Sequence, residues 1–191
     1  MQGAVTKVTI NKDYRCFKEG EIFTFDPHVT LLVGDQGSGK STLLKAMHGM
    51  QDWLNIELSL QCLSEGCKTY FFDTEKMNPR SKGDLSDINN SDVYVQHVAS
   101  HFQSHGEVIR AFVLKPLQKS KNEEAVLFLD EPESGLSVRS QYEIVKEIKK
   151  QKNKQFIIAT HSIVFMEAFK KVLSLEHRQW MDTKQFLNTQ K

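Results

Sequence analysis

The sequence lacks an excess of either charge, a cysteine framework and a long apolar run. Its net charge is +1, so bulk electrostatics give no reason to expect nucleic acid or an anionic membrane as a partner. Three cysteines are odd in number and too few for a disulfide scaffold, which favours a reducing compartment. No stretch approaches the roughly 18 apolar residues of a membrane span, and the first residues lack the apolar core of a signal peptide. We therefore expect a cytoplasmic protein without membrane insertion.

What is present suits one folded domain. The chain has 191 residues, of which 39% are hydrophobic and 26% charged, enough for a sizeable core. Continuous apolar runs interleaved with stretches of helical spacing predict an α/β fold with a mostly parallel sheet. Strands are predicted at 4–10, 21–25, 29–33, 69–73, 125–129 and 155–159. Helices are predicted at 40–50, 92–103, 106–119, 137–150 and 162–171. The last stretch, 172–191, is predicted to hold one strand and a polar tail.

The segment GDQGSGKST follows a predicted buried strand and precedes a predicted helix. It matches the P-loop pattern G-x-x-x-x-G-K-[ST]. Glycines let several backbone N–H groups face one anion, and a helix N-terminus adds partial positive charge. Lys40 is expected to reach the β- and γ-phosphates of ATP, and the Ser41 hydroxyl to ligate Mg²⁺. The predicted ATP-binding residues are Gly34, Asp35, Gln36, Gly37, Ser38, Gly39, Lys40, Ser41 and Thr42. A glycine-rich turn of no function is the alternative, which the lysine, serine and flanking elements disfavour.

The segment AVLFLDE runs from a buried strand directly into two carboxylates. Ligand sites of open α/β sheets lie at the carboxyl ends of strands, which predicts Asp130 beside the phosphates. Asp130 is expected to hold Mg²⁺, directly or through water. Glu131 is expected to orient or deprotonate the attacking water. The alternative is an acidic cap on the next helix.

In series, these segments resemble the ABC ATPase superfamily and, within it, the SMC/RecF-like branch of soluble ATPases. They are also similar to small stand-alone ATPases of bacteria and phages. LLVGDQGSGKSTLLKAM resembles the Walker A segment, AVLFLDEPESGLS the Walker B segment and D-loop, and QFIIATHS the switch segment with its histidine, His161. The D-loop positions are Ser134, Gly135, Leu136 and Ser137. SHGE resembles a variant ABC signature at Ser104, His105, Gly106 and Glu107, with the histidine in place of a small residue.

The resemblance implies a single ABC ATPase head over residues 1–191. Its expected fold is α/β, a P-loop NTPase with a mostly parallel central sheet, an N-terminal antiparallel β portion and a reduced helical lobe at about 76–120. Two heads would form a head-to-tail homodimer around ATP and Mg²⁺. The signature of one head would contact the nucleotide of the other, with Glu131 and His161 catalytic. Hydrolysis would then switch the conformation of a DNA- or protein-associated complex.

Two other functions stay open. One is an ATP-binding regulatory module of a defence, counter-defence or toxin-type complex with little turnover. The other is a nucleotide-binding subunit of a transporter, which SHGE and the small lobe disfavour. No Q-loop glutamine is evident in TYFFDTEKMNPR, where Glu75, or else Asp73, is the candidate to substitute near the metal; the alternative is a structural turn.

Smaller patterns each have two interpretations. The aromatics before the P-loop, Tyr14, Phe17 and Phe23, are either adenine-stacking or core residues, with core favoured. Histidines 97, 101 and 105 are either a zinc site or polar-face side chains, with the latter favoured. The pair Cys62 and Cys67 lacks a second ligand pair and is expected to be inert. Two runs of lysines suggest either solvated helix faces or contact with DNA or phosphate. These runs are Lys115, Lys119 and Lys121, and Lys146, Lys149, Lys150, Lys152 and Lys154.

Overall fold

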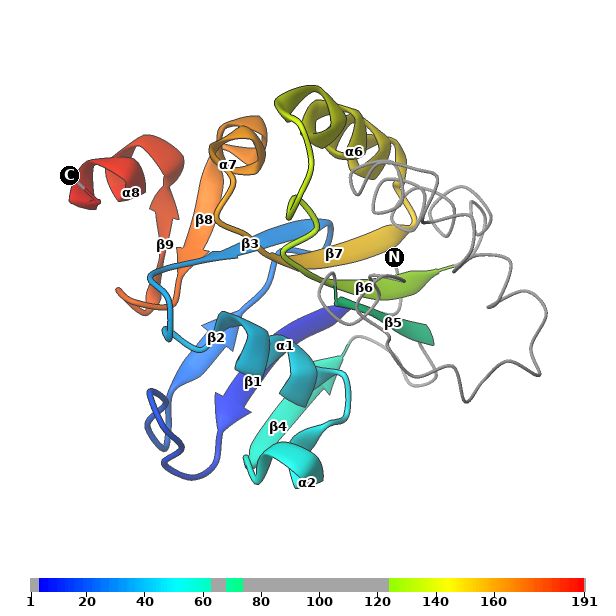
Figure 1. Ribbon diagram of the computed structural model, residues 1–191. Coiled ribbons are helices and arrows are strands. Elements are labelled where there is room, and N and C mark those ends of the chain that lie inside the picture. Colours follow the sequence, from blue (N-terminus) through cyan, green and yellow to red (C-terminus); the bar gives the residue numbers. More distant parts are fainter. Residues whose placement is uncertain (1–3, 63–67, 74–123, 191) are drawn as a thin grey trace, which may run out of the picture.

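A six-stranded sheet forms the centre of the molecule in a computed structural model, which describes residues 4–62, 68–73 and 124–190 (Figure 1). The strand order is β5-β6-β7-β3-β8-β9, and all neighbours are parallel except β8 and β9. The strands are β3 (Val29–Val33), β5 (Lys68–Asp73), β6 (Ala125–Asp130), β7 (Lys154–Ala159), β8 (Lys171–Ser174) and β9 (Gln179–Asp182). The mostly parallel α/β sheet is thus confirmed.

The central strands are buried because helices or a second sheet cover both of their faces. Every residue of β6 and β7 is buried, which agrees with their continuous apolar sequences. Side chains that alternate along these strands divide between two hydrophobic clusters. One cluster contains residues of α6 (Val138–Lys150), α7 (Ile163–Phe169) and α8 (Thr183–Thr189). The other contains residues of α1 (Lys40–Met47) and the smaller sheet.

The smaller sheet is antiparallel, in the order β2-β1-β4. Its strands are β1 (Val5–Ile10), β2 (Ile22–Thr24) and β4 (Leu58–Cys62), and the short helix α2 (Gln51–Leu54) precedes β4. Figure 1 shows it below the main sheet, on the side of α1 and opposite α6 and α7. The side chain of Gln155 on β7 joins the two sheets, accepting a hydrogen bond from Val5 N at 2.8 Å and donating one to Val5 O at 2.7 Å. The predicted N-terminal antiparallel portion is confirmed.

The C-terminal prediction is wrong. In place of one strand and a polar tail, residues 171–189 form the hairpin β8–β9 and helix α8. Met181 and Phe186 are buried, so this segment belongs to the core despite its polar composition. The strand β4 and the helix α2 were not predicted. Helices 92–103 and 106–119 and the lobe at about 76–120 lie outside the described residues. None of the described helices is long and apolar enough to cross a membrane.

The basic run that extends from α6 to the start of β7 is not uniformly exposed. Lys146, Lys149, Lys150 and Lys152 are exposed, as a solvated face requires. Lys154, the first residue of β7, is instead fully buried. It therefore belongs to the interior and not to a surface that could bind DNA.

Candidate functional site

The P-loop connects β3 to α1 and curls tightly. Gly39 is the residue before the helix and has φ 96°, a left-handed conformation that disfavours other residues. A β-carbon there would lie 2.5 Å from Phe17 Cζ and 2.7 Å from Cys16 Sγ. The segment 16–17 therefore packs directly on the backbone of the loop. The need for glycine at this position comes from both the backbone conformation and this close approach.

Lys40 lies inside the curl of the loop. Its ammonium donates hydrogen bonds to Gly34 O at 2.8 Å and Asp35 O at 3.0 Å. Burial lowers the pKa of Lys40, and the nearby carboxylates of Glu131 and Asp130 oppose this shift. The loop thus holds one cation among its own carbonyl oxygens, at the place where the sequence predicts a phosphate.

Ser41 and Asp130 meet next to the lysine. The Ser41 hydroxyl donates to Asp130 Oδ1 at 2.8 Å. Burial raises the pKa of Asp130, and the bond from Ser41 and the charge of Lys45 act in the opposite direction. Lys45 lies 3.6 Å from Asp130 Oδ2 and 3.3 Å from Asp73 Oδ2. Asp73 pairs with Asp130 in the strand register, so both carboxylates stand at one edge of the sheet.

The structure therefore brings together two of the predicted metal residues and one of the two candidates for the missing glutamine. Asp73 is beside Asp130, through a strand pairing that the sequence alone does not show. The other candidate, Glu75, lies outside the described residues. The signature positions Ser104, His105, Gly106 and Glu107 and the histidines at 97 and 101 also lie outside them, as does Cys67.

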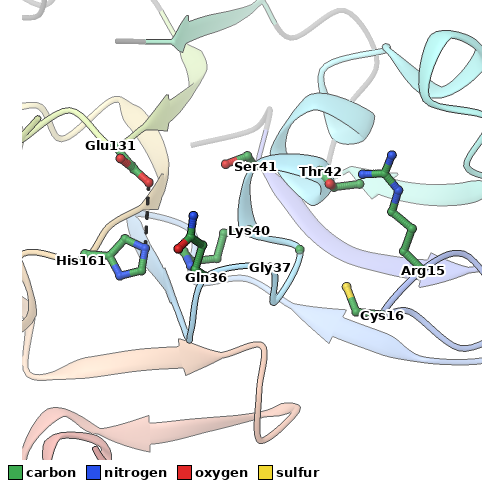
Figure 2. A pocket seen from close by; sticks show the side chains of 10 residues that line it. Arg15, Cys16, Gln36, Gly37, Lys40, Ser41, Thr42, Glu131 and His161 are labelled. Atoms are coloured by element: carbon green, nitrogen blue, oxygen red, sulfur yellow. Dashed lines mark ion pairs between the residues drawn. The ribbon is translucent and has the colours of Figure 1, made fainter. Parts of the chain in front are cut away.

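Glu131 and His161 approach each other from neighbouring strands. Glu131 directly follows β6 with φ 48°, a left-handed turn, and its N–H donates to Ala159 O at 2.9 Å. His161 follows β7, and its Nε2 lies 3.9 Å from Glu131 Oε1 (Figure 2). Both side chains are about half exposed, at 45% for Glu131 and 50% for His161. They are therefore accessible to a ligand.

These groups line one pocket of about 290 Å³. Its lining residues are Arg15, Cys16, Gln36, Gly37, Gly39, Lys40, Ser41, Thr42, Glu131 and His161. Figure 2 shows Glu131 and His161 on one side of the P-loop and Arg15 and Cys16 on the other. The predicted positions Gly34, Asp35 and Ser38 belong to the loop but are not among the lining residues.

Arg15 and Cys16 were not predicted. Arg15 has φ 51° and its guanidinium lies 5.3 Å from the centre of the Tyr14 ring. Their position between Tyr14 and Phe17, in the segment considered for adenine stacking, was the only sequence signal for them. Phe17 and Phe23 are buried in the core, so the preferred interpretation of these two aromatics is confirmed.

The segment after Glu131 is hydrogen-bonded to the segment after β7, which the sequence predicts to be the switch segment. Glu133 Oε1 accepts hydrogen bonds from Thr160 Oγ1 at 2.7 Å and from His161 N at 2.8 Å. The positions predicted to form a D-loop come next: Ser134 N donates to Glu131 O at 3.0 Å, and Leu136 is buried. Ser137 caps α6 by accepting a hydrogen bond from Ser140 N.

Comparison with solved structures identifies the fold. The chain is similar to cbiO1 from Clostridium perfringens, part of the ABC transporter complex cbiONQ, with a TM-score of 0.61 and 20% identity over 98% of this chain and 92% of that one. It is also similar to MJ1267, an ATP-binding cassette of an ABC transporter in its ADP conformation. The TM-score is 0.53, and the identity is 18% over 95% of this chain and 90% of that one. The chain has the fold of an ABC ATPase head.

A third structure with the ABC ATPase head fold is dimeric. It is a post-hydrolysis state of the ATP-binding cassette MJ0796 bound to ADP and Pi, with a TM-score of 0.54 and 14% identity over 96% of this chain and 99% of that one. Two family models match parts of the chain. An "AAA domain" model matches residues 7–51, and one described as "AAA domain, putative AbiEii toxin, Type IV TA system" matches residues 109–167. The comparison with curated proteins finds no match.

The oxygen donors of this site fit a magnesium nucleotide. Ser41 and Asp130 supply a hydroxyl and a carboxylate 2.8 Å apart, which are hard oxygen donors of the kind Mg²⁺ prefers. Magnesium is usually held by one or two carboxylates together with substrate phosphates, and not by a full protein cage. Lys40 and the helix N-terminus beside them supply the positive charge that phosphates need.

Proposed function

We propose that this protein binds Mg-ATP on its P-loop and hydrolyses it. The observation that carries the proposal is that Lys40, Ser41, Glu131 and His161 line one pocket. They come from three separate parts of the chain and correspond to the four chemical tasks of phosphoryl transfer to water. These tasks are phosphate charge neutralisation, metal binding, activation of water and recognition of the terminal phosphate.

Each residue has a role that its surroundings support. Lys40 would exchange its bonds to Gly34 O and Asp35 O for bonds to phosphate oxygens. Ser41 and Asp130 would hold Mg²⁺, which supplies neutralisation of phosphate charge when bound. Glu131 is exposed enough to accept a proton from a water molecule, and His161 stands within 3.9 Å of it to orient that water.

We further propose that hydrolysis occurs between two heads. The exposed pocket and the dimeric cassette of the same fold support this arrangement. The signature residues Ser104, His105, Gly106 and Glu107 would then close the pocket of the partner copy. The D-loop, residues 134–137, would lie between the two sites. Closure of the pair would act on a protein or DNA partner.

The test is Glu131→Gln, which keeps the size of the side chain and removes the base. Wild-type protein should release phosphate from Mg-ATP, and the variant should release at least about 100-fold less while still binding ATP. The variant should accumulate as a nucleotide-bound dimer in analytical ultracentrifugation. Glu143→Gln, a partly exposed carboxylate on α6 that does not line the pocket, is the matched control. Equal phosphate release by wild type and Glu131→Gln would refute the role of Glu131.

A second candidate function is favoured by the family model over residues 109–167, whose description names a toxin of a type IV toxin–antitoxin system. In that case ATP would act mainly as a conformational ligand of a toxin-type or defence complex. The purified chain would then turn over ATP negligibly, and turnover would rise on addition of a co-purified protein. Brisk turnover by the chain alone would exclude this candidate.

A further inference from the structure

Glu133 carries a contact that the hydrolytic roles do not use. Its carboxylate comes from the segment after β6 and reaches the segment after β7, 28 residues further along the chain. One oxygen, Oε1, accepts from Thr160 Oγ1 at 2.7 Å and from His161 N at 2.8 Å. Thr160 Oγ1 in turn accepts from Ser162 N at 3.0 Å. A single carboxylate oxygen thus organises the switch backbone over three consecutive residues.

Stability alone does not account for a carboxylate at this place. The second oxygen, Oε2, is buried and has no hydrogen-bond partner among the described residues. Desolvation raises the pKa of Glu133, and the bonds from Thr160 and His161 oppose this shift. Since a buried, half-satisfied carboxylate costs free energy, the residue is better explained by what it positions.

The backbone carbonyl of Glu133 contacts the D-loop. Leu136 N donates to Glu133 O at 3.0 Å, closing a tight turn. A second link runs in parallel through Gln141 on α6. Its Nε2 donates to Leu136 O at 3.2 Å, and its Oε1 accepts from Ser162 Oγ at 2.6 Å. Displacement of this turn therefore pulls on the backbone of residues 160–162.

We propose that Glu133 is a positioning residue that couples the D-loop to His161. The imidazole of His161 is half exposed, and its backbone N–H is held by Glu133, so a shift of the turn changes the 3.9 Å separation between His161 Nε2 and Glu131 Oε1. A second head that presses on the D-loop thereby adjusts the histidine of the first. This proposal rests on the proposed hydrolysis only for its effect on turnover. The mechanical link itself is independent of nucleotide.

The link is tested first without ATP, by amide hydrogen exchange measured by NMR. Glu133→Ala should speed exchange of the His161 amide at least ten-fold. Glu133→Gln retains an acceptor oxygen and should keep exchange within about three-fold of wild type, as should the control Glu167→Ala, an exposed carboxylate on α7. Unchanged exchange in Glu133→Ala overturns the proposal. If Glu133→Ala does not fold, Thr160→Val removes one of the two bonds that fix Oε1 and should speed exchange of the His161 amide, which donates to the same oxygen. Unchanged exchange of the His161 amide in that variant is equally decisive.

The second test is a double-mutant cycle on ATP turnover. Glu133→Ala should lower kcat 10- to 100-fold with KM within about three-fold, because Glu133 does not line the pocket. In a His161→Ala background the same change should lower kcat less than two-fold, since its effect passes through the histidine. Additive losses would overturn the coupling. Absence of turnover in wild type would refute hydrolysis and leave the exchange experiment to decide the link.

Discussion

At the scale of single residues, the ammonium group of the P-loop lysine is already hydrogen-bonded to carbonyl oxygens of its own loop. Lys40 donates to two carbonyl oxygens of residues 34 and 35, and it is buried. A phosphate bound as we propose would replace these carbonyls as acceptors, and it would be favoured because a charged acceptor forms stronger hydrogen bonds than a neutral one. The loop therefore holds the ammonium near its working position.

The close approach at Gly39 gives a prediction about stability. Gly39→Ala places a methyl group against Phe17 and Cys16 and also strains φ 96°. Gly49→Ala is the matched control, because Gly49 has φ 98° and no atom within 4 Å of its added β-carbon. We expect a cost of about 1–2 kcal/mol for Gly49→Ala from the backbone alone. Gly39→Ala should cost a further 1–3 kcal/mol or so for overpacking. Equal losses in urea denaturation would contradict the contact.

Glu133 gives a prediction about pH. Its pKa is raised by burial above the ordinary value of 4.5, so the folded chain binds this proton more tightly than the unfolded chain. The free energy of unfolding therefore falls as pH rises from about 4.5 through the raised pKa, and Glu133→Gln lacks this loss. The stability of the variant relative to wild type should rise over that window and then level off. Parallel urea-denaturation curves at every pH would contradict this expectation.

Residues in one contiguous motif were the most predictable part of the site. The proximity of Lys40, Ser41, Asp130 and Glu131 could be predicted because the P-loop pattern and the acidic strand end are local patterns. The contacts of Asp73 with Lys45, and of Glu133 with His161, depend on which strands are neighbours. A single sequence does not contain that information, since strand order is a property of the whole sheet.

At the scale of elements, the second strand of the C-terminal hairpin and the helix after it could not be predicted from hydrophobic periodicity. The strands β3, β6 and β7 are continuous apolar runs and were predicted because both of their faces are covered. In contrast, β9 and α8 each bury only a few side chains and are otherwise polar, so the apolar residues of neither segment show a clear strand or helix period. Strand β4 was missed for the same reason, because four of its five residues are exposed.

The contribution of α8 can be measured by truncating its buried aromatic side chain. Phe186→Ala should cost about 3–5 kcal/mol, the usual loss for a buried phenylalanine. The neighbouring Gln185→Ala is exposed and should cost less than about 0.5 kcal/mol. Both are measured by urea denaturation. A loss below about 1 kcal/mol for Phe186→Ala would mean that α8 is not an integral part of the core.

At the scale of the whole molecule, one pocket draws on widely separated parts of the chain. Its walls come from the segment before β2, the loop before α1 with the first turn of that helix, and the residues just after β6 and β7. Since the folded chain alone assembles these parts, a ligand that binds there stabilises the folded state.

Mg-ATP at about 100 times its Kd should add about 2.7 kcal/mol to the free energy of unfolding. For a chain of this size, that corresponds to a rise in Tm of roughly 5–10 °C. Lys40→Ala should abolish the rise, while the control Lys18→Ala, an exposed lysine, should retain it. Thermal unfolding with and without Mg-ATP checks both. An undiminished rise in Lys40→Ala would contradict phosphate binding at this loop.

The strand that carries the P-loop pairs only with strands that come much later in the chain. β3 lies between β7 and β8, and Gln155 closes the gap to Val5 across 150 positions. During synthesis on the ribosome, β3 and the loop after it therefore emerge well before any strand that they pair with. The nascent chain must keep this apolar segment from aggregating until residues 154–174 have left the exit tunnel. A nascent chain interrupted before β7 therefore lacks both strands that pair with β3, and its pocket is not assembled.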